Sequence, residues 1–183
     1  MFQKSSKFFP GLIVGLALAG SLAAPGLRAA GLESVYSDLD PKRCKNVKEA
    51  EDSFEMTCPG VAGFRLLVLE GDLRSSVTVI DPQGKEHPLE FWSVITGGFS
   101  TLGPKAEWRV EKQGGKSLPK ALIVRVNASE NPEKPNVKTS YLAVAKITPQ
   151  EICVTDKVAP GPKMNEEARM AADSAAARPC RKP

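Results

Sequence analysis

The sequence contains a single histidine, His87, among its 183 residues. Any reaction that needs an imidazole must therefore use this one residue. A Ser-His-Asp triad would depend on it, yet the sequence has no Gly-x-Ser-x-Gly motif to present the serine. His87 lies between Glu86 and Pro88 next to an expected turn, where a solvated loop residue is the ordinary interpretation. We expect no hydrolytic site built on His87.

The spacings typical of zinc and nucleotide sites are also missing. The two closest cysteines, Cys44 and Cys58, are fourteen residues apart, whereas structural zinc sites use closely spaced Cys or His pairs. Gly114–Ser117 resembles the end of a P-loop, but Val110 occupies the position of that motif's first glycine. We expect a turn at these glycines, and neither a metal nor a cofactor.

The body of the chain lacks an excess of charge of either sign. The whole chain has 25 basic and 21 acidic residues, and the first 30 residues hold Lys4, Lys7 and Arg28 but no acid. The remainder has 22 basic residues (25 − 3) and 21 acidic ones, a net charge of +1. A nucleic-acid-binding domain would be expected to carry a basic stripe, so we expect no nucleic-acid partner.

Residues 1–30 have the pattern of a secretory signal peptide. Lys4 and Lys7 precede an apolar stretch, and small residues then favour cleavage within residues 23–30, after Ala23 or Ala29. A retained anchor is the alternative, but the 17 apolar residues 8–24 include Pro10 and three glycines, at the lower limit for spanning a bilayer. We expect a periplasmic or secreted protein with no stable membrane anchor after cleavage.

The four cysteines all lie in the expected mature chain, residues 31–183. Four cysteines allow three pairings, and we favour the local one, Cys44–Cys58 with Cys153–Cys180. Cys44 and Cys58 flank an expected hairpin, and Cys153 and Cys180 flank an expected helix. An oxidising compartment favours disulfides over a metal site.

Alternation of apolar and polar residues predicts a single, mainly β domain over residues 31–183. Phe64–Leu69 is nearly continuous in apolar residues and suggests a strand buried on both faces. The other strand patterns include these residues: Phe54, Met56, Cys58, Val77, Val79, Trp108, Val110, Leu122, Val124, Val126 and the run Tyr141–Thr148. We expect an antiparallel β-sandwich or a partly closed barrel.

One α-helix is expected at the C-terminal end, over residues 164–178. Asn165 is a suitable N-cap, the first turn is acidic, and Pro179 ends the helix. Its apolar stripe is almost entirely alanine (Ala168, Ala171, Ala172 and Ala175). Alanine buries little area, so a disulfide through Cys180 would help to hold this helix in place.

Aromatic residues are concentrated between residues 91 and 108, where Gly97 and Gly98 interrupt the strand pattern. Core packing is the ordinary interpretation, and alternation places Trp108 in the core. The alternative is a surface that presents aromatic rings to a protein or glycan partner beside a positive rim. The candidate partner-binding residues are Phe91, Trp92, Phe99, Lys105 and Arg109.

These observations favour an exported, non-enzymatic binding or accessory protein of the cell envelope. One alternative is an enzyme with an unrecognised carboxylate site, for which Asp38 and Asp40 are a close acidic pair. Another alternative is a purely structural envelope protein. We identify no catalytic residue from the sequence.

Four segments carry a resemblance to other proteins: Tyr36–Asp40, Cys58–Gly60, Glu70–Arg74 and Leu102–Arg109. Together with the cysteines they span most of residues 36–180, and the last segment is the most specific. The chain resembles a group of proteobacterial exported proteins with no established activity. The resemblance implies export and a shared fold, and it assigns no catalytic residue.

Export with cleavage is directly testable. Mass spectrometry of the periplasmic fraction should find a new N-terminus between Ala24 and Gly31, because the small-residue cluster ends there. Recovery of intact Met1 in the membrane fraction would show that the leader is a retained anchor instead.

Overall fold

A computed structural model describes residues 1–2, 31–131, 133–134 and 136–183, so the expected signal peptide lies almost entirely outside the described residues. The ten strands in this part of the chain form two five-stranded antiparallel sheets. In spatial order, sheet A contains β1 (Glu33–Asp38), β7 (Phe99–Gln113), β8 (Lys116–Ser129), β9 (Thr139–Ile147) and β10 (Ile152–Val158). Sheet B contains β2 (Lys45–Ala50), β3 (Ser53–Pro59), β4 (Arg65–Gly71), β5 (Arg74–Ile80) and β6 (Glu86–Pro88).

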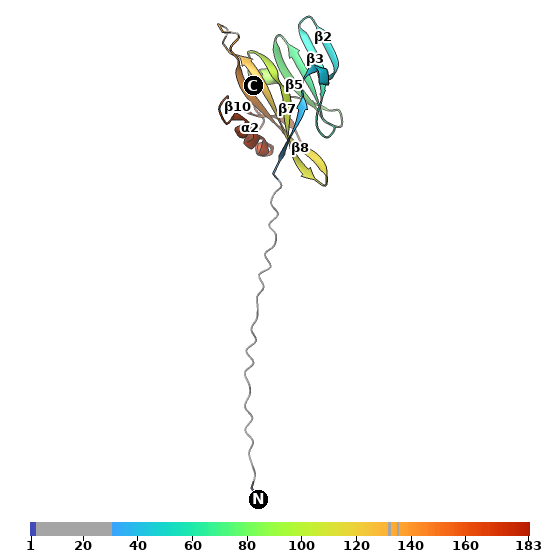
Figure 1. Cartoon of the computed structure of the whole chain (residues 1–183), viewed down its shortest axis with the longest axis vertical. Coiled ribbons are helices and arrows are strands. Elements are labelled where there is room, and N and C mark those ends of the chain that lie inside the picture. The colour runs from blue at the N-terminus through green and yellow to red at the C-terminus, as the bar shows by residue number, and fades with distance from the viewer. Residues whose placement is uncertain (3–30, 132, 135) are drawn as a thin grey trace.

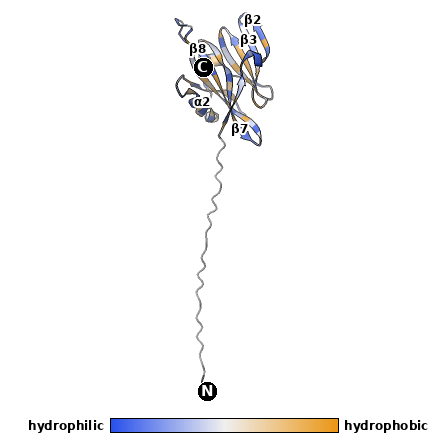
Figure 2. Cartoon of the chain, viewed as in Figure 1, coloured by the Kyte–Doolittle hydropathy of each residue, from blue (hydrophilic) through white to orange (hydrophobic). Residues whose placement is uncertain are grey.

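The two sheets pack face to face as a sandwich and do not close into a barrel (Figure 1). Hydrophobic residues recur along the strands in the middle of the domain (Figure 2). Alternate residues of β3, β4, β5, β7 and β8 supply the core between the sheets, as expected for strands with one face inward. The predicted mainly β fold is confirmed. Of the two expected architectures, a sandwich and a partly closed barrel, the structure has the sandwich.

Trp108 is the largest fully buried side chain and lies on the inward face of β7. Its ring centroid is 6.0 Å from that of Phe64, and its Nε1 donates a hydrogen bond to Ser37 Oγ at 2.9 Å. Buried indole nitrogens need such a partner. Trp108 therefore joins β7 both to β1 and to the turn that precedes β4.

The start of β7 also connects the two sheets. The Ser100 amide donates to the Leu73 carbonyl oxygen at 2.9 Å. The Ser75 amide donates to Ser100 Oγ at 3.2 Å, and the Ser75 hydroxyl donates to the Ser100 carbonyl at 3.0 Å. These bonds hold the first residues of β7 along the start of β5, beyond the part of β5 that pairs with β6. The short helix α1 (Phe91–Val94) packs against β5 just before this crossing.

Helix α2 (Met164–Asp173) covers the outer face of sheet A, on the opposite side of the domain from β2 and β3 (Figure 1). The predicted alanine stripe is confirmed, since all four alanines are buried against β8 and β9. Arg169 Nε donates to Glu107 Oε1 at 2.6 Å. Burial alone would raise the pKa of Glu107, but hydrogen bonds from Arg169 and Ser34 hold this pKa below its ordinary value.

Both predicted disulfides are present, Cys44–Cys58 and Cys153–Cys180, and the described residues include no free cysteine. Among these residues, no helix has the length and apolar character needed to cross a bilayer. The predicted turn between β7 and β8 is also confirmed, because Gly114 and Gly115 both have positive φ angles there.

Three details of the sequence interpretation are wrong. Helix α2 ends at Asp173 and a 3₁₀ turn (Ala175–Ala177) follows, whereas one helix over residues 164–178 was expected. Its N-cap is Lys163, and Asn165 instead accepts a hydrogen bond from Arg125 at 3.2 Å. Strand β4 is not buried on both faces, because its alternate leucines point to the outer face of sheet B and are partly exposed.

The packing of Trp108 predicts a specific requirement for glycine at residue 60. A Cβ atom at Gly60 would lie 2.6 Å from the Phe64 carbonyl oxygen and 2.8 Å from Trp108 Cζ2. Gly60→Ala should therefore lower the free energy of unfolding by about 1–3 kcal/mol, as overpacking does, measured by urea denaturation. Gly71→Ala is the matched control, because a Cβ there meets nothing within 4 Å. Equal effects of the two substitutions would contradict the proposed packing constraint.

Candidate functional site

Two of the predicted partner-binding residues are inside the protein. Phe91 is fully buried, and its amide donates to Ser76 Oγ at 3.0 Å. Arg109 is buried under α2, where its Nε and one terminal nitrogen donate to the two carboxylate oxygens of Asp173 at 2.7 and 2.9 Å. Such a two-pronged contact fixes the side chain. Phe91 and Arg109 therefore have structural roles and do not contribute to a surface.

The other three predicted residues reach the surface but are not brought together as expected. Trp92 is partly buried on α1, and Phe99 is 50% exposed at the start of β7. Lys105 is exposed, with its Nζ 4.0 Å from a carboxylate oxygen of Asp38. Phe99 and Lys105 are six residues apart on one strand, a separation of roughly 20 Å at the usual rise per residue. The predicted positive rim is therefore not beside Phe99.

Phe99 instead lies near Leu73, a residue that the sequence analysis did not single out. Leu73 is 63% exposed and occupies the tight turn between β4 and β5. The hydrogen bond from Ser100 to the Leu73 carbonyl sets the two segments side by side. We call this region the acidic end, defined by residues 49–54, 70–74, 97–99 and 129–131. The predicted aromatic site and the observed surface share only Phe99.

The hollow at the acidic end is lined by carboxylates. It has a volume of about 710 Å³ and is bounded by the β2–β3 and β4–β5 turns. Among the described residues no lysine, arginine or histidine lines it, although Arg74 pairs with its Asp72 at 2.8 Å. Its five acidic residues are Glu49, Glu51, Asp52, Glu70 and Asp72. A smaller, more apolar hollow of about 400 Å³ adjoins it and shares Phe54 and Glu70. The acidic end is thus a concave surface with negative charge and exposed apolar side chains.

The backbone of the β4–β5 turn is unusual for its sequence. Asp72 and Leu73 have φ angles of +51° and +57°, which is the left-handed region. Two-residue hairpin turns of this kind favour Asn-Gly or Asp-Gly, and the left-handed conformation costs a non-glycine residue about 1–2 kcal/mol. Leu73 thus carries this cost while its side chain remains mostly in solvent.

A second concave site lies where the sheets separate at the opposite end. His87 on β6 has its Nε2 3.2 Å from Asp81 Oδ2, and both side chains are largely buried. Asp81 Oδ1 also accepts hydrogen bonds from the amides of Gln83 and Lys85. Burial of the carboxyl opposes its ionisation, but the bonds from His87 and the two amides lower the pKa of Asp81 below its ordinary value. Asp81 therefore orients His87.

The acidic pair of the enzyme hypothesis, Asp38 and Asp40, is engaged in local contacts. Asp38 faces Lys105, and Asp40 accepts the Lys42 amide at 2.9 Å, which caps the 3₁₀ turn Pro41–Arg43. Both carboxylates thus have local structural partners.

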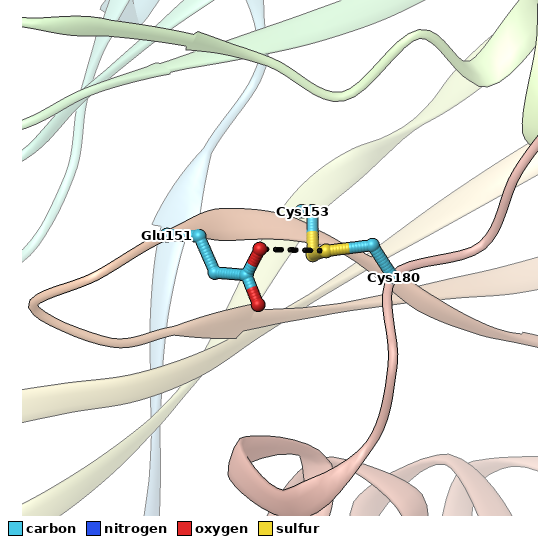
Figure 3. Close-up of side chains that lie close together, drawn as sticks. All are labelled: Glu151, Cys153 and Cys180. Carbon is cyan, nitrogen blue, oxygen red and sulfur yellow. Dashed lines mark hydrogen bonds between the residues drawn. A yellow bond between two sulfur atoms is a disulfide. The ribbon is translucent and has the colours of Figure 1, made fainter.

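Glu151 lies beside the Cys153–Cys180 disulfide, with one carboxylate oxygen 3.2 Å from Cys180 Sγ (Figure 3). These three residues are the single group of metal-ligand type found within the described part of the chain. Metal sites use thiolates, and both sulfurs are occupied in the disulfide. The contact is also not an ordinary hydrogen bond, since a disulfide sulfur carries no hydrogen. Lys146 Nζ neutralises Glu151 at 2.5 Å, so the cluster is structural.

No family model, curated protein or solved structure matches this chain.

The lowered pKa of Asp81 predicts how its contribution to stability depends on pH. The ionised carboxylate stabilises the fold at neutral pH, and this stabilisation is lost as the pH falls through the folded pKa, below about pH 4. Asp81→Asn should lower the melting temperature at pH 7, and the difference from the wild type should shrink between about pH 5 and pH 2. Thermal denaturation across this pH range measures it. Asp52→Asn, which removes an exposed carboxylate, is the matched control, and a pH-independent effect of Asp81→Asn would contradict the assignment.

Proposed function

We propose that the protein is an exported, non-enzymatic binding or accessory protein of the cell envelope. Its acidic end captures a protein partner through a basic segment that also carries apolar side chains. The observation that carries this proposal is the exposure of Leu73, which lines the carboxylate-lined hollow, and of Phe99, whose neighbour Ser100 is hydrogen-bonded to the Leu73 carbonyl. Exposed apolar residues of this kind, when clustered and rimmed by polar groups, are typical of interaction sites.

The conformation of Leu73 supports this proposal independently of its exposure. A leucine at a left-handed position is unfavourable compared with glycine, and this side chain buries little area in return because it is 63% exposed. Local strain that folding does not repay points to a functional site. A partner that covers Leu73 would bury this apolar side chain.

The charge of the hollow selects the kind of partner. Arg74 pairs with Asp72 at 2.8 Å, which leaves four of the five lining carboxylates without an ion-pair partner among the described residues. The hollow would therefore attract lysine and arginine side chains and repel anionic ones. Anionic envelope glycans are disfavoured for the same reason, and a neutral glycan would have only the half-exposed Phe99 and the partly buried Phe54 as aromatic rings at the described acidic end. A basic protein segment uses both the apolar side chains and the charge.

The two disulfides are consistent with a non-cytoplasmic protein. Together with the leader pattern of residues 1–30, they support the proposed location in the periplasm or outside the cell. A partner in that compartment is accessible to the acidic end without any membrane crossing.

Site-specific photo-crosslinking tests the proposed function. A photo-reactive benzoyl-phenylalanine is placed at residue 73 or residue 99 of the exported protein in living cells, and the crosslinked peptides are sequenced. We expect one partner at both positions, with crosslinked segments enriched in lysine and arginine. Residue 62, in the turn between β3 and β4, is the control position. Crosslinking no stronger than at residue 62, or crosslinking to acidic segments, would overturn the proposal.

A paired substitution separates binding from folding. Leu73→Gly should preserve or raise the melting temperature, because glycine adopts the left-handed conformation without strain, while it weakens partner capture at least tenfold. Ala62→Gly is the matched control, since Ala62 also has a positive φ of +54°. This control should be equally stable and should retain full capture. If Leu73→Gly retains capture as well, Leu73 is not part of the binding surface.

A further inference from the structure

The smaller hollow that adjoins the acidic end is lined by residues of both sheets. We call it the inter-sheet hollow. Its volume is about 400 Å³, within the usual range for ligand pockets. Sheet B contributes residues of β3, β4 and β5, and sheet A contributes the start of β7 and the segment that follows β1. Its apolar lining residues include Leu39, Pro41, Phe54, Met56, Val68 and Leu102.

The sheet A side of the hollow is irregular but held in place. Strand β1 ends at Asp38, and the pairing of β7 with β8 shifts register between Leu102 and Ala106. The Leu39 amide donates a hydrogen bond to the Pro104 carbonyl oxygen at 2.9 Å, which joins the two irregular segments. Bulges of this kind are conserved features that occur preferentially beside functional sites. The hollow is therefore built into the fold.

Core side chains and partly exposed apolar side chains both line the inter-sheet hollow. Met56 and Val68 are 4% and 5% exposed and belong to the core between the sheets. Phe54 and Leu102 pack against this core but remain only partly buried. An apolar group that enters the hollow would cover the exposed parts of Phe54 and Leu102, and burial of apolar surface is favourable.

The charge of the inter-sheet hollow is negative. Asp40 and Glu70 line it, and no cationic residue of the described chain does. Asp40 accepts the Lys42 amide, and no ion pair engages either carboxylate in the described part of the chain. Glu70 Oε2 lies 3.1 Å from the Ser75 hydroxyl, but this group has one hydrogen and also lies 3.0 Å from the Ser100 carbonyl oxygen. Glu70 therefore keeps acceptor capacity for a cation.

We infer that the inter-sheet hollow receives an apolar side chain of the basic segment that the acidic end captures. A lysine or arginine that flanks this apolar residue pairs with Glu70. The inference rests on the proposed function and names the element that the protein recognises in its partner. The two hollows share Phe54 and Glu70, so one segment can contact both. An apolar anchor that fills a pocket commonly dominates the energy of such an interface.

Methionine methyl groups give a direct readout of binding. Met56 lines the hollow, whereas Met164 and Met170 lie on α2 over the outer face of sheet A and serve as internal references. The purified exported protein, isotope-labelled at its methionine methyl groups, is titrated with the peptide acetyl-Lys-Leu-Lys-amide at fixed pH and ionic strength. The Met56 signal should shift and saturate with a Kd on the order of 1 mM, and the two reference signals should not move.

Two further peptides separate the apolar from the charged contribution. Acetyl-Lys-Ser-Lys-amide keeps the charge and should bind at least about tenfold more weakly, because it lacks the buried leucine side chain. Acetyl-Gln-Leu-Gln-amide keeps the leucine and should bind about two- to tenfold more weakly, the range that partly exposed ion pairs support.

A charge-removing substitution locates the cation. Glu70→Gln should weaken binding of acetyl-Lys-Leu-Lys-amide about two- to fivefold without changing binding of acetyl-Gln-Leu-Gln-amide. Glu86→Gln is the matched control, because Glu86 is exposed on β6 and does not line the hollow. The inference would be overturned by the absence of a saturable Met56 shift up to about 50 mM peptide, roughly fifty times the expected Kd. Equal movement of the reference signals, equal binding of the serine peptide, or equal effects of the two substitutions would also overturn it.

This inference and the proposed function fail separately. If residues 73 and 99 crosslink to basic segments in cells while Met56 does not respond to the peptide, the proposed function stands and the inference is wrong. If Met56 responds as expected but those crosslinks do not form, the hollow is a peptide site and the proposed capture at the acidic end is wrong.

Discussion

The burial of Trp108 is the constraint on which the rest of this fold depends. Its indole fills the space between the sheets, packs against Phe64 and requires glycine at residue 60. Its Nε1 binds Ser37 and so fixes β1 against β7. With the inward face of β7 set in this way, the outward face presents its charged residues to helix α2. One aromatic side chain thereby fixes which charges of β7 face the helix.

Much of this architecture follows from local sequence patterns. Strict alternation around Trp108 and Val110 identifies the inward face of β7. A register shift of one residue would turn the charged side chains of this strand into the core. The two disulfides are predictable because each joins cysteines close to a single hairpin or helix. The alanine stripe marks the buried side of α2 correctly. The expected hairpin between Cys44 and Cys58 is present as β2 and β3, but the bounds of β2 could not be predicted because all six of its residues are exposed and show no alternation.

The candidate sites are much less predictable than the fold, because they depend on contacts between distant segments. The pairing of Arg109 with Asp173 spans 64 residues, and nothing near Arg109 in the sequence indicates that α2 will cover it. Phe91 is buried because it lies on a helix of only four residues, which is too short to be predicted from a sequence pattern. The sequence gives one local indication of Leu73, because an apolar residue is unusual in a two-residue turn that favours glycine. Its position beside Phe99 depends on the crossing of β7 onto β5, which the sequence does not indicate.

The covering of sheet A by α2 has a consequence for how the protein is made. The face beneath the helix is apolar and includes Ile123 and Val144, yet α2 follows both strands in the chain and its disulfide partner Cys180 comes later still. If sheet A forms before α2 docks, it carries an uncovered hydrophobic face, a surface prone to self-association. The Cys153–Cys180 disulfide then ties the segment after the helix to β10.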